Sequence, residues 1–241
     1  MVVAARALAG SNADDTRKLA AVRTVIYEAG AWNDNRPFAY DMRDPLGRNI
    51  NNKLLATYVS TRLGNCVSMP VLFLIVADRL GLNVALATAP HHVFVRYTDA
   101  EGRAVNLETT SGGHPARDVW YRQNMPMTDL ALSNGIYMRT LSPRESVATM
   151  ALTVGEFLLG AGRYPEVIDV AEVIGEYAPR DVGPILLAAE AYGRLFAQEF
   201  ENRYPTPDAI PPNLHARYRE LATMNASLYA HAEALGWRPS E

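Results

Sequence analysis

Residues 64–82 read GNCVSMPVLFLIVADRLGL, and this stretch places a cysteine directly before a long apolar segment. Cys66 is the only cysteine in the 241 residues, which excludes an intramolecular disulfide and every Cys-x-x-Cys zinc or redox site. The apolar run continues to Leu80, and Gly81 supplies a stop signal for a helix. The stretch therefore predicts a helix from near Cys66 to Leu80.

The start of this helix determines the chemistry of the thiol. Asn65 is a favourable N-cap, whereas Pro70, which has no N–H, favours a start at Ser68 with the proline in the first turn. With either start Cys66 lies at or just before the helix N-terminus, where the macrodipole and free N–H groups favour a thiolate. One interpretation is a nucleophile. The other is a packing residue, because cysteine is among the most buried residue types.

Short apolar stretches replace the helical pattern after the helix. Three of them predict antiparallel strands, at 83–89, 92–97 and 103–109. A loop of three or four residues around the DAEG turn would pair residues whose numbers sum to about 200 or 201. His92 then lies opposite position 108 or 109, so we expect His92 and Glu108 to be neighbours on one face of the sheet.

A histidine beside a carboxylate can activate a thiol. The carboxylate fixes the tautomer of the imidazole and stabilises the imidazolium, as a Cys-His-carboxylate triad requires. His92 is therefore the candidate base and Glu108 the candidate orienter. Asn106 shares the face of Glu108 by the strand period of two and is the reserve orienter. The alternative is an incidental polar pair on an exposed sheet face.

Helical patterns flank the predicted strands. Apolar spacing predicts one helix within 16–30 and another at 51–63, with an irregular segment at 31–50 between them. Helical spacing returns at Ser146 and continues to a final helix near 214–235.

Small and large residues in this second half follow a repeat. Gly155, Leu158 and Ala171 stand close to where a tetratricopeptide helix pair places them, but a segment with four prolines, YPTPDAIPPN, interrupts the next repeat. A plain helical bundle is the alternative interpretation. We expect two domains, at 1–143 and 144–241.

Composition argues against several kinds of partner. A formal net charge of -3 without a basic patch argues against nucleic acid and against binding to an anionic membrane. The longest apolar run, at 67–77, is too short to span a membrane, and the N-terminus lacks the apolar block of a secretory signal. We therefore expect a cytoplasmic protein, unless a leader has been removed. His91, His92 and His114 lack the spacing of a metal site, so no metal or other cofactor is expected.

Three motifs in this order resemble the core of the transglutaminase-like superfamily: GNCVSMPVLFLIVADRLGL, PHHVFVRY and VNLETTSGG. The resemblance covers roughly residues 35 to 115, and the helical second half resembles the bacterial branch in which the core is joined to tetratricopeptide-like helices. It implies an α+β fold of the papain type, in which a helix packs against an antiparallel sheet. It also implies that Cys66 is the nucleophile, His92 the base and Glu108 the orienter.

Two positions depart from the family pattern. The family usually has aspartate where Glu108 stands, so the longer side chain must still meet the histidine. His91 occupies a place where glycine is frequent, and only one of two adjacent strand residues can face Glu108. The family motif and the pairing of the strands both select His92.

The resemblance implies a thiol enzyme that attacks an amide of a peptide or protein and forms a thioester. Backbone N–H groups at the helix start would hold the oxyanion, with the Asn65 side chain as an accessory donor, and the helical half could present the substrate. Acyl transfer to a small amine is a variant of this chemistry. The alternative from another class is an inactive scaffold whose helical half binds a protein partner, because some superfamily members are binding proteins. The sequence does not distinguish hydrolysis, deamidation and cross-linking.

Overall fold

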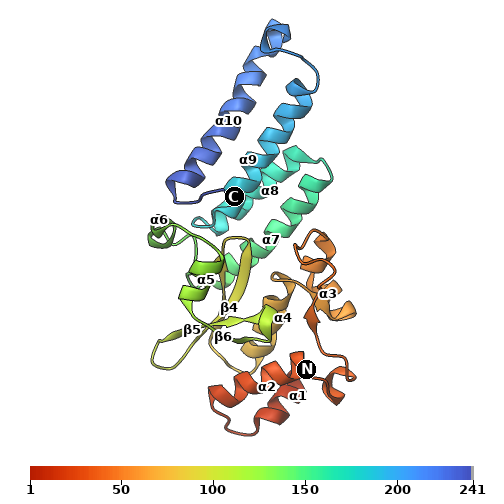
Figure 1. Cartoon of the computed structure of the whole chain (residues 1–241), viewed down its shortest axis with the longest axis vertical. Helices are drawn as coiled ribbons and strands as arrows, with labels where there is room; N and C mark the ends of the chain where they lie inside the picture. Colours follow the sequence, from red (N-terminus) through yellow and green to blue (C-terminus); the bar gives the residue numbers. More distant parts are fainter. Residues whose placement is uncertain (240–241) are drawn as a thin grey trace. The chain divides into compact units, whose positions relative to one another are not determined.

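The structure is a computed structural model that describes residues 1–239 (Figure 1). Two compact units divide the chain. The first contains residues 1–126 and 138–146, and the second contains residues 127–137 and those from 147 onward. The domain bounds expected from the sequence, 1–143 and 144–241, stay a prediction.

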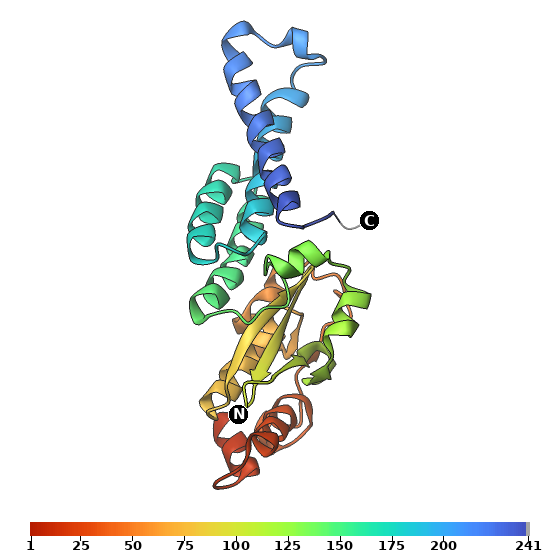
Figure 2. The same ribbon diagram turned by 90° about the vertical axis from the view of Figure 1, so that its left-hand side faces the viewer.

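Helix α4, Ser68–Arg79, is the central element of the first unit. It contacts helices α2 and α3 as well as strands β3 and β4, and Figures 1 and 2 show it packed against the sheet. A helix that is apolar on most of its surface has to be buried in this way. It starts at Ser68 with Pro70 in its first turn, which is the second of the two starts considered from the sequence.

The other helices of the first unit are shorter or less apolar. They are α1 (Val2–Ala9), α2 (Asp15–Tyr27), α3 (Leu55–Thr61) and α5 (Asp118–Asn124). Neither α1 nor α5 was expected from the sequence. The helix predicted at 51–63 is two elements, the 3₁₀ helix η2 (Ile50–Lys53) and α3, because Leu54 between them is extended.

A four-stranded antiparallel sheet with the order β3-β4-β5-β6 confirms the expected α+β class. Its strands are β3 (Val84–Ala89), β4 (His92–Thr98), β5 (Ala104–Glu108) and β6 (His114–Ala116). The fourth strand was missed, since it has only three residues and contains a proline. One face of β4 and β5 carries His92, Phe94, Asn106 and Glu108, because alternate residues of a strand share a face.

The register of β4 and β5 corrects the predicted pairing. Val95 pairs with Leu107 and Thr98 with Ala104, so the paired numbers sum to 202 rather than to 200 or 201. The loop has five residues, because the Asp99 carboxylate accepts hydrogen bonds from the backbone N–H groups of Glu101 and Arg103 and extends the turn. Continued along the strands, this register places Glu108 opposite Phe94 and diagonally from His92.

The segment at 31–50, expected to be irregular, contributes to a second, small sheet. Strand β1 (Ala39–Tyr40) pairs in parallel with β2 (Leu63–Gly64), just before Cys66. A short 3₁₀ helix, η1 (Ala31–Asn33), precedes it. This pairing places the loop that follows Tyr40 next to the start of α4.

The second unit is helical, as expected. Its elements are α6 (Asp129–Ser133), α7 (Pro143–Gly160, whose first turn belongs to the first unit), α8 (Tyr164–Tyr177), α9 (Gly183–Phe196), the π-helical turn η4 (Ala197–Glu201), the 3₁₀ helices η5 (Pro207–Ala209) and η6 (Pro212–Leu214), and α10 (His215–Ala234). Leu158, Ala171 and Leu187 belong to one buried cluster that joins α7, α8 and α9. A Cβ atom added at Gly155 would lie 2.1 Å from Leu187 Cδ2, so a side chain at this position would have to displace Leu187 from the cluster. None of the helices in residues 1–239 is long and apolar enough to cross a membrane.

Candidate functional site

Cys66 lies two residues before α4 and is half-buried. The preceding residue, Asn65, shapes this start: its side-chain Oδ1 accepts hydrogen bonds from the N–H groups of Val67 and Ser68. Its backbone carbonyl accepts a further bond from the N–H of Met69. The side chain and the backbone of Asn65 therefore fix the conformation of the segment that joins Cys66 to α4.

The turn between β3 and β4 meets the thiol. The Cys66 Sγ lies 3.8 Å from the carbonyl oxygen of His91, which with Pro90 forms the two-residue turn closed by the pairing of Ala89 and His92. His91 has a positive φ of 55°, a conformation that favours glycine. This explains why glycine is frequent there in the family that the sequence resembles, and why His91 itself does not lie in the strand.

His92 connects the thiol to the carboxylate. Its Nε2 lies 2.8 Å from Oε2 of Glu108, and Cys66 is the other residue whose interaction raises the pKa of the ring. Because Nε2 faces Glu108, the nitrogen available to the thiol is Nδ1. The structure thus brings the three residues selected from the sequence together at one site, with His92 bonded to Glu108 and the thiol at the turn that precedes His92.

The register of β4 and β5 explains how a glutamate at position 108 reaches His92. A residue two positions away across an antiparallel pair is roughly 7 to 8 Å distant, against roughly 5 Å for a directly opposed one. Glutamate is one methylene longer than aspartate, and here it spans the diagonal to reach His92. The departure from the family pattern is therefore compatible with the contact.

The Glu108 carboxylate is 4% exposed, and both its oxygens have two partners. Oε1 accepts from the N–H and the hydroxyl of Thr110, while Oε2 accepts from His92 and from the Tyr121 hydroxyl at 2.9 Å. Burial alone would raise the pKa of Glu108, but the hydrogen bond and charge of His92, together with the bonds from Thr110, lower it below its ordinary value. Glu108 is therefore ionised at neutral pH.

Opposing influences act on His92. Burial is the largest of them and lowers the pKa of the imidazole, but the hydrogen bonds with Cys66 and Glu108 and the charges of both outweigh it. Together they raise the pKa of His92 to about 9. The ring is therefore an imidazolium at neutral pH, between a sulfur atom and a carboxylate.

Sequence reasoning missed the residues that surround this pair. Tyr121 is fully buried, and its ring stacks on Phe94 with ring centroids 4.3 Å apart and lies 6.0 Å from the ring of His92. Thr110 follows Glu108 in the 3₁₀ helix η3 (Thr109–Ser111). The only sequence signal for Tyr121 is Asp118 at the start of a short apolar stretch, too short to reveal a helix by its periodicity.

The two accessory candidates have other partners. Asn106, the reserve orienter, accepts a bond from Arg96 Nε and donates to Asp118 Oδ1, and the structure does not bring it to His92. The Asn65 Nδ2 atom is buried and has no hydrogen-bond partner within residues 1–239, and a Cβ atom on Gly47 would lie 3.2 Å from it. Neither side chain belongs to the group formed by Cys66, His92 and Glu108.

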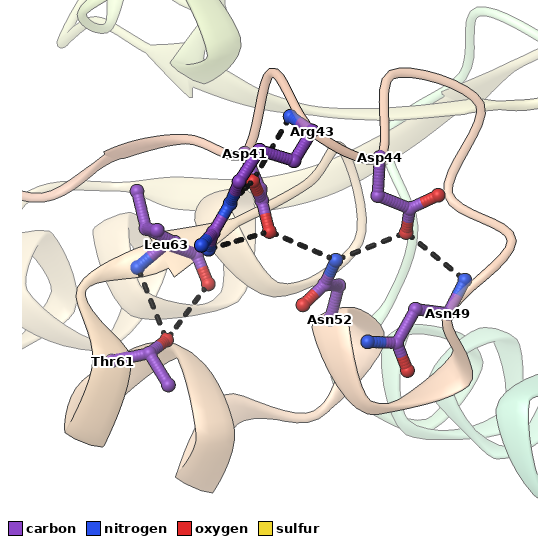
Figure 3. A network of polar contacts seen from close by, with 7 residues as sticks. All are labelled: Asp41, Arg43, Asp44, Asn49, Asn52, Thr61 and Leu63. Carbon is purple, nitrogen blue, oxygen red and sulfur yellow. Dashed lines mark hydrogen bonds and ion pairs between the residues drawn. The ribbon is translucent and has the colours of Figure 1, made fainter.

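A polar network fixes the loop beside the thiol (Figure 3). The amide of Asn52 donates to the carboxylates of Asp41 and Asp44, at 3.3 and 2.9 Å, and Asp44 also accepts from the N–H of Asn49, so the network joins the two ends of the loop at 41–49. The Tyr40 hydroxyl donates to the carbonyl of Pro45 in this loop, and burial, followed by the charge of Cys66, raises the pKa of Tyr40. Ser68 Oγ donates to the carbonyl of Asn52 at 2.7 Å and so attaches this loop to α4.

Across the described chain, no group of three or more His, Cys, Asp or Glu side chains is placed to hold a metal ion.

Comparison with protein families matches residues 1–150 to a model described as the transglutaminase-like superfamily. This range covers most of the chain and contains all of α1 to α6, the four-stranded sheet and the candidate site. Comparison with curated proteins finds no match, and comparison with solved structures finds none either.

Proposed function

Because the chain belongs to the transglutaminase-like superfamily, we propose that it is a thiol-dependent acyl-transfer enzyme acting on amide bonds of a peptide or protein. Membership supports a thiol fold of the papain type and protein substrates. The observation that carries the proposal is the 2.8 Å contact between His92 and Glu108, next to the turn whose His91 carbonyl contacts the Cys66 thiol.

In the first half of the proposed reaction, Cys66 reacts as a thiolate whose proton is held on Nδ1 of His92, in keeping with the imidazolium described above. The sulfur attacks the carbonyl carbon of the amide, and the carbonyl electron pair moves to oxygen to give a tetrahedral intermediate. When the oxyanion collapses, the C–N bond breaks and the His92 imidazolium gives its proton to the departing ammonia or amine. A thioester on Cys66 remains.

In the second half, water or a second amine attacks the thioester carbon while His92 takes its proton. The C–S bond then breaks, and the thiolate of Cys66 leaves. Water gives hydrolysis or deamidation, and an amine gives transamidation. Throughout, the charge of Glu108 stabilises the imidazolium form of His92.

The oxyanion in this proposal is held at the start of α4. The N–H groups of Val67 and Ser68 already donate to the Asn65 side chain, so the N–H of Cys66 itself is the candidate donor. The bonds from these two N–H groups to Asn65 Oδ1 support a role for Asn65 in shaping the helix start.

The test pairs two adjacent histidines in the full chain. His92→Asn should lower the rate of Cys66 alkylation by iodoacetamide at pH 7 by tenfold or more, because the base and its charge are lost, whereas His91→Asn should change it by less than about twofold. Asparagine suits the control because it tolerates the positive φ of His91. Each modified molecule reports on Cys66, the only cysteine.

Substrate chemistry is read separately by mass spectrometry. A library of glutamine-containing peptides incubated with the protein should give a thioester adduct on Cys66 and release ammonia, and Cys66→Ala should abolish both. An alkylation rate that is equal in wild type and His92→Asn, with no adduct, would favour the scaffold alternative. Added primary amine distinguishes transamidation from hydrolysis by the mass of the product.

A further inference from the structure

Tyr121 shares an oxygen atom with the candidate base. Its hydroxyl donates to Oε2 of Glu108 at 2.9 Å, and the same oxygen lies 2.8 Å from Nε2 of His92. Tyr121 is 0% exposed. A charge-assisted hydrogen bond in such a buried setting draws electron density away from the carboxylate oxygen that accepts it.

The helix that carries Tyr121 is anchored to the sheet by a second polar network. Asp118, the first residue of α5, accepts a hydrogen bond of 2.6 Å from Asn106 Nδ2 and forms an ion pair with Arg96 at 3.6 Å. Asn106 in turn accepts from Arg96 Nε at 2.8 Å. Arg96 and Asn106 pair across β4 and β5, so the sheet that carries His92 and Glu108 also positions Tyr121.

We propose that Tyr121 is a positioning residue for the His92 and Glu108 pair, and that its hydroxyl limits how strongly Glu108 holds the proton on His92. The oxygen Oε2 is shared between two donors, so each receives less of its negative charge. The consequence for catalysis rests on the proposed function. The effect of Tyr121 on the pKa of His92 does not, because it is present whether or not the protein turns over a substrate.

The consequence for the proposed reaction lies in the step that releases the amine. His92 has to give up its proton to the leaving nitrogen, and a catalytic acid works best when its pKa lies near the operating pH. Without the Tyr121 hydroxyl, Oε2 would concentrate its charge on the imidazolium. The proton would then be held more tightly and transferred more slowly.

Other ionisable groups face this cluster and must be considered in a titration. Cys66 and Glu108 influence the pKa of His92, and Arg96 and Asp118 influence that of Tyr121. His92 influences the pKa of Glu108, and the charge of Glu108 in turn raises the pKa values of three tyrosines: Tyr121, Tyr27 and Tyr40. Burial, followed by the charge and hydrogen bond of Glu108, raises the pKa of Tyr121 well above its ordinary value. Tyr121 therefore remains a proton donor over the whole range in which His92 titrates.

The test compares Tyr121→Phe with Tyr27→Phe in the full-length protein. Phenylalanine keeps the stacking on Phe94 and removes only the hydroxyl. Tyr27 is the matched control: it also senses the charge of Glu108, but its buried hydroxyl has no hydrogen-bond partner in the described part of the chain. Circular dichroism checks that both variants are folded, and NMR titration of the histidine ring protons, assigned with His92→Asn, reports the pKa of His92.

We expect Tyr121→Phe to raise the pKa of His92 by about 0.5 to 1, the effect of one lost bond to a charged acceptor, and Tyr27→Phe to move it by less than about 0.2. An unchanged or lowered pKa in Tyr121→Phe, or an equal change in both variants, would overturn the proposal. A raised pKa together with an inert Cys66 would keep this inference and refute the proposed function. Should Tyr121→Phe fail to fold, Tyr121→Leu removes the hydroxyl without adding volume or a new donor and is judged by the same titration.

Discussion

Replacing Glu108 by glutamine removes the carboxylate charge beside His92 while nearly preserving the shape of the side chain. Burial would still lower the pKa of the imidazole, and only the influence of Cys66 would continue to raise it. The pKa of His92 lies at about 9, against an ordinary value of 6.5, and we expect Glu108→Gln to lower it by about 1.5 to 2.5. NMR titration of the histidine ring protons measures this change.

The same change predicts a difference in stability with pH. The pKa of His92 is higher in the folded protein than in the unfolded chain, so its stabilising effect is fully present below pH 6.5 and is lost as the pH rises through about 9. The rise from 6.5 to about 9 corresponds to at most ~3.4 kcal/mol, and the His92 side chain is only 9% exposed. In Glu108→Gln most of this pH dependence should disappear.

Urea unfolding at pH 6, 7.5 and 9.5, followed by circular dichroism, provides the assay. The wild-type free energy of unfolding should fall between pH 6.5 and 9.5, and that of Glu108→Gln should change much less. Glu101→Gln is the control, because Glu101 is an exposed carboxylate in the loop that follows β4. If Glu108→Gln kept a His92 pKa near 9 and the wild-type pH dependence, the carboxylate would not be the cause of the raised pKa.

Two further substitutions test particular contacts. Glu108→Asp shortens the side chain that spans the diagonal, so it should lower the pKa of His92 and reduce the free energy of unfolding by roughly 1.5 to 3 kcal/mol, the value of a hydrogen bond to a charged group. If the pKa of His92 and the free energy of unfolding both stayed at their wild-type values, the diagonal would not require glutamate. Gly155→Ala forces a Cβ atom against Leu187 and should reduce the free energy of unfolding by about 1 to 3 kcal/mol in denaturation experiments, whereas Gly160→Ala, at a position with open space, should be tolerated. Equal stability of these two alanine variants would contradict the packing described for α7.

Local patterns were sufficient for the elements that carry the candidate site. Helix α4 could be predicted because its apolar residues are contiguous and end at a glycine, and β4 and β5 because their residues alternate. Even the neighbourhood of His92 and Glu108 followed from the pairing of two adjacent strands. Short elements without such patterns, including α5 and β6, were missed because tertiary contacts stabilise them more than their own residues do.

The exact pairing of β4 and β5 shows where local reasoning ends. The Asp99 side chain accepts two backbone hydrogen bonds within a five-residue loop, two residues longer than the loop that would place Glu108 directly opposite His92, so Glu108 takes a diagonal position. The contact with His92 persists only because glutamate is long enough to span the diagonal. Register depends on side-chain hydrogen bonds in the turn, which composition does not reveal.

The sequence by itself determined the helices α2 and α4, the strands β3, β4 and β5, their order, the placement of the lone thiol before a helix and the choice of His92 over His91. These properties depend on residue type and periodicity along the chain. Only the tertiary structure decided the diagonal contact of Glu108, the burial of Tyr121 against it and the pKa of His92. Each of these depends on distances between segments far apart in the sequence, because hydrogen bonds and desolvation act over a few ångströms in space.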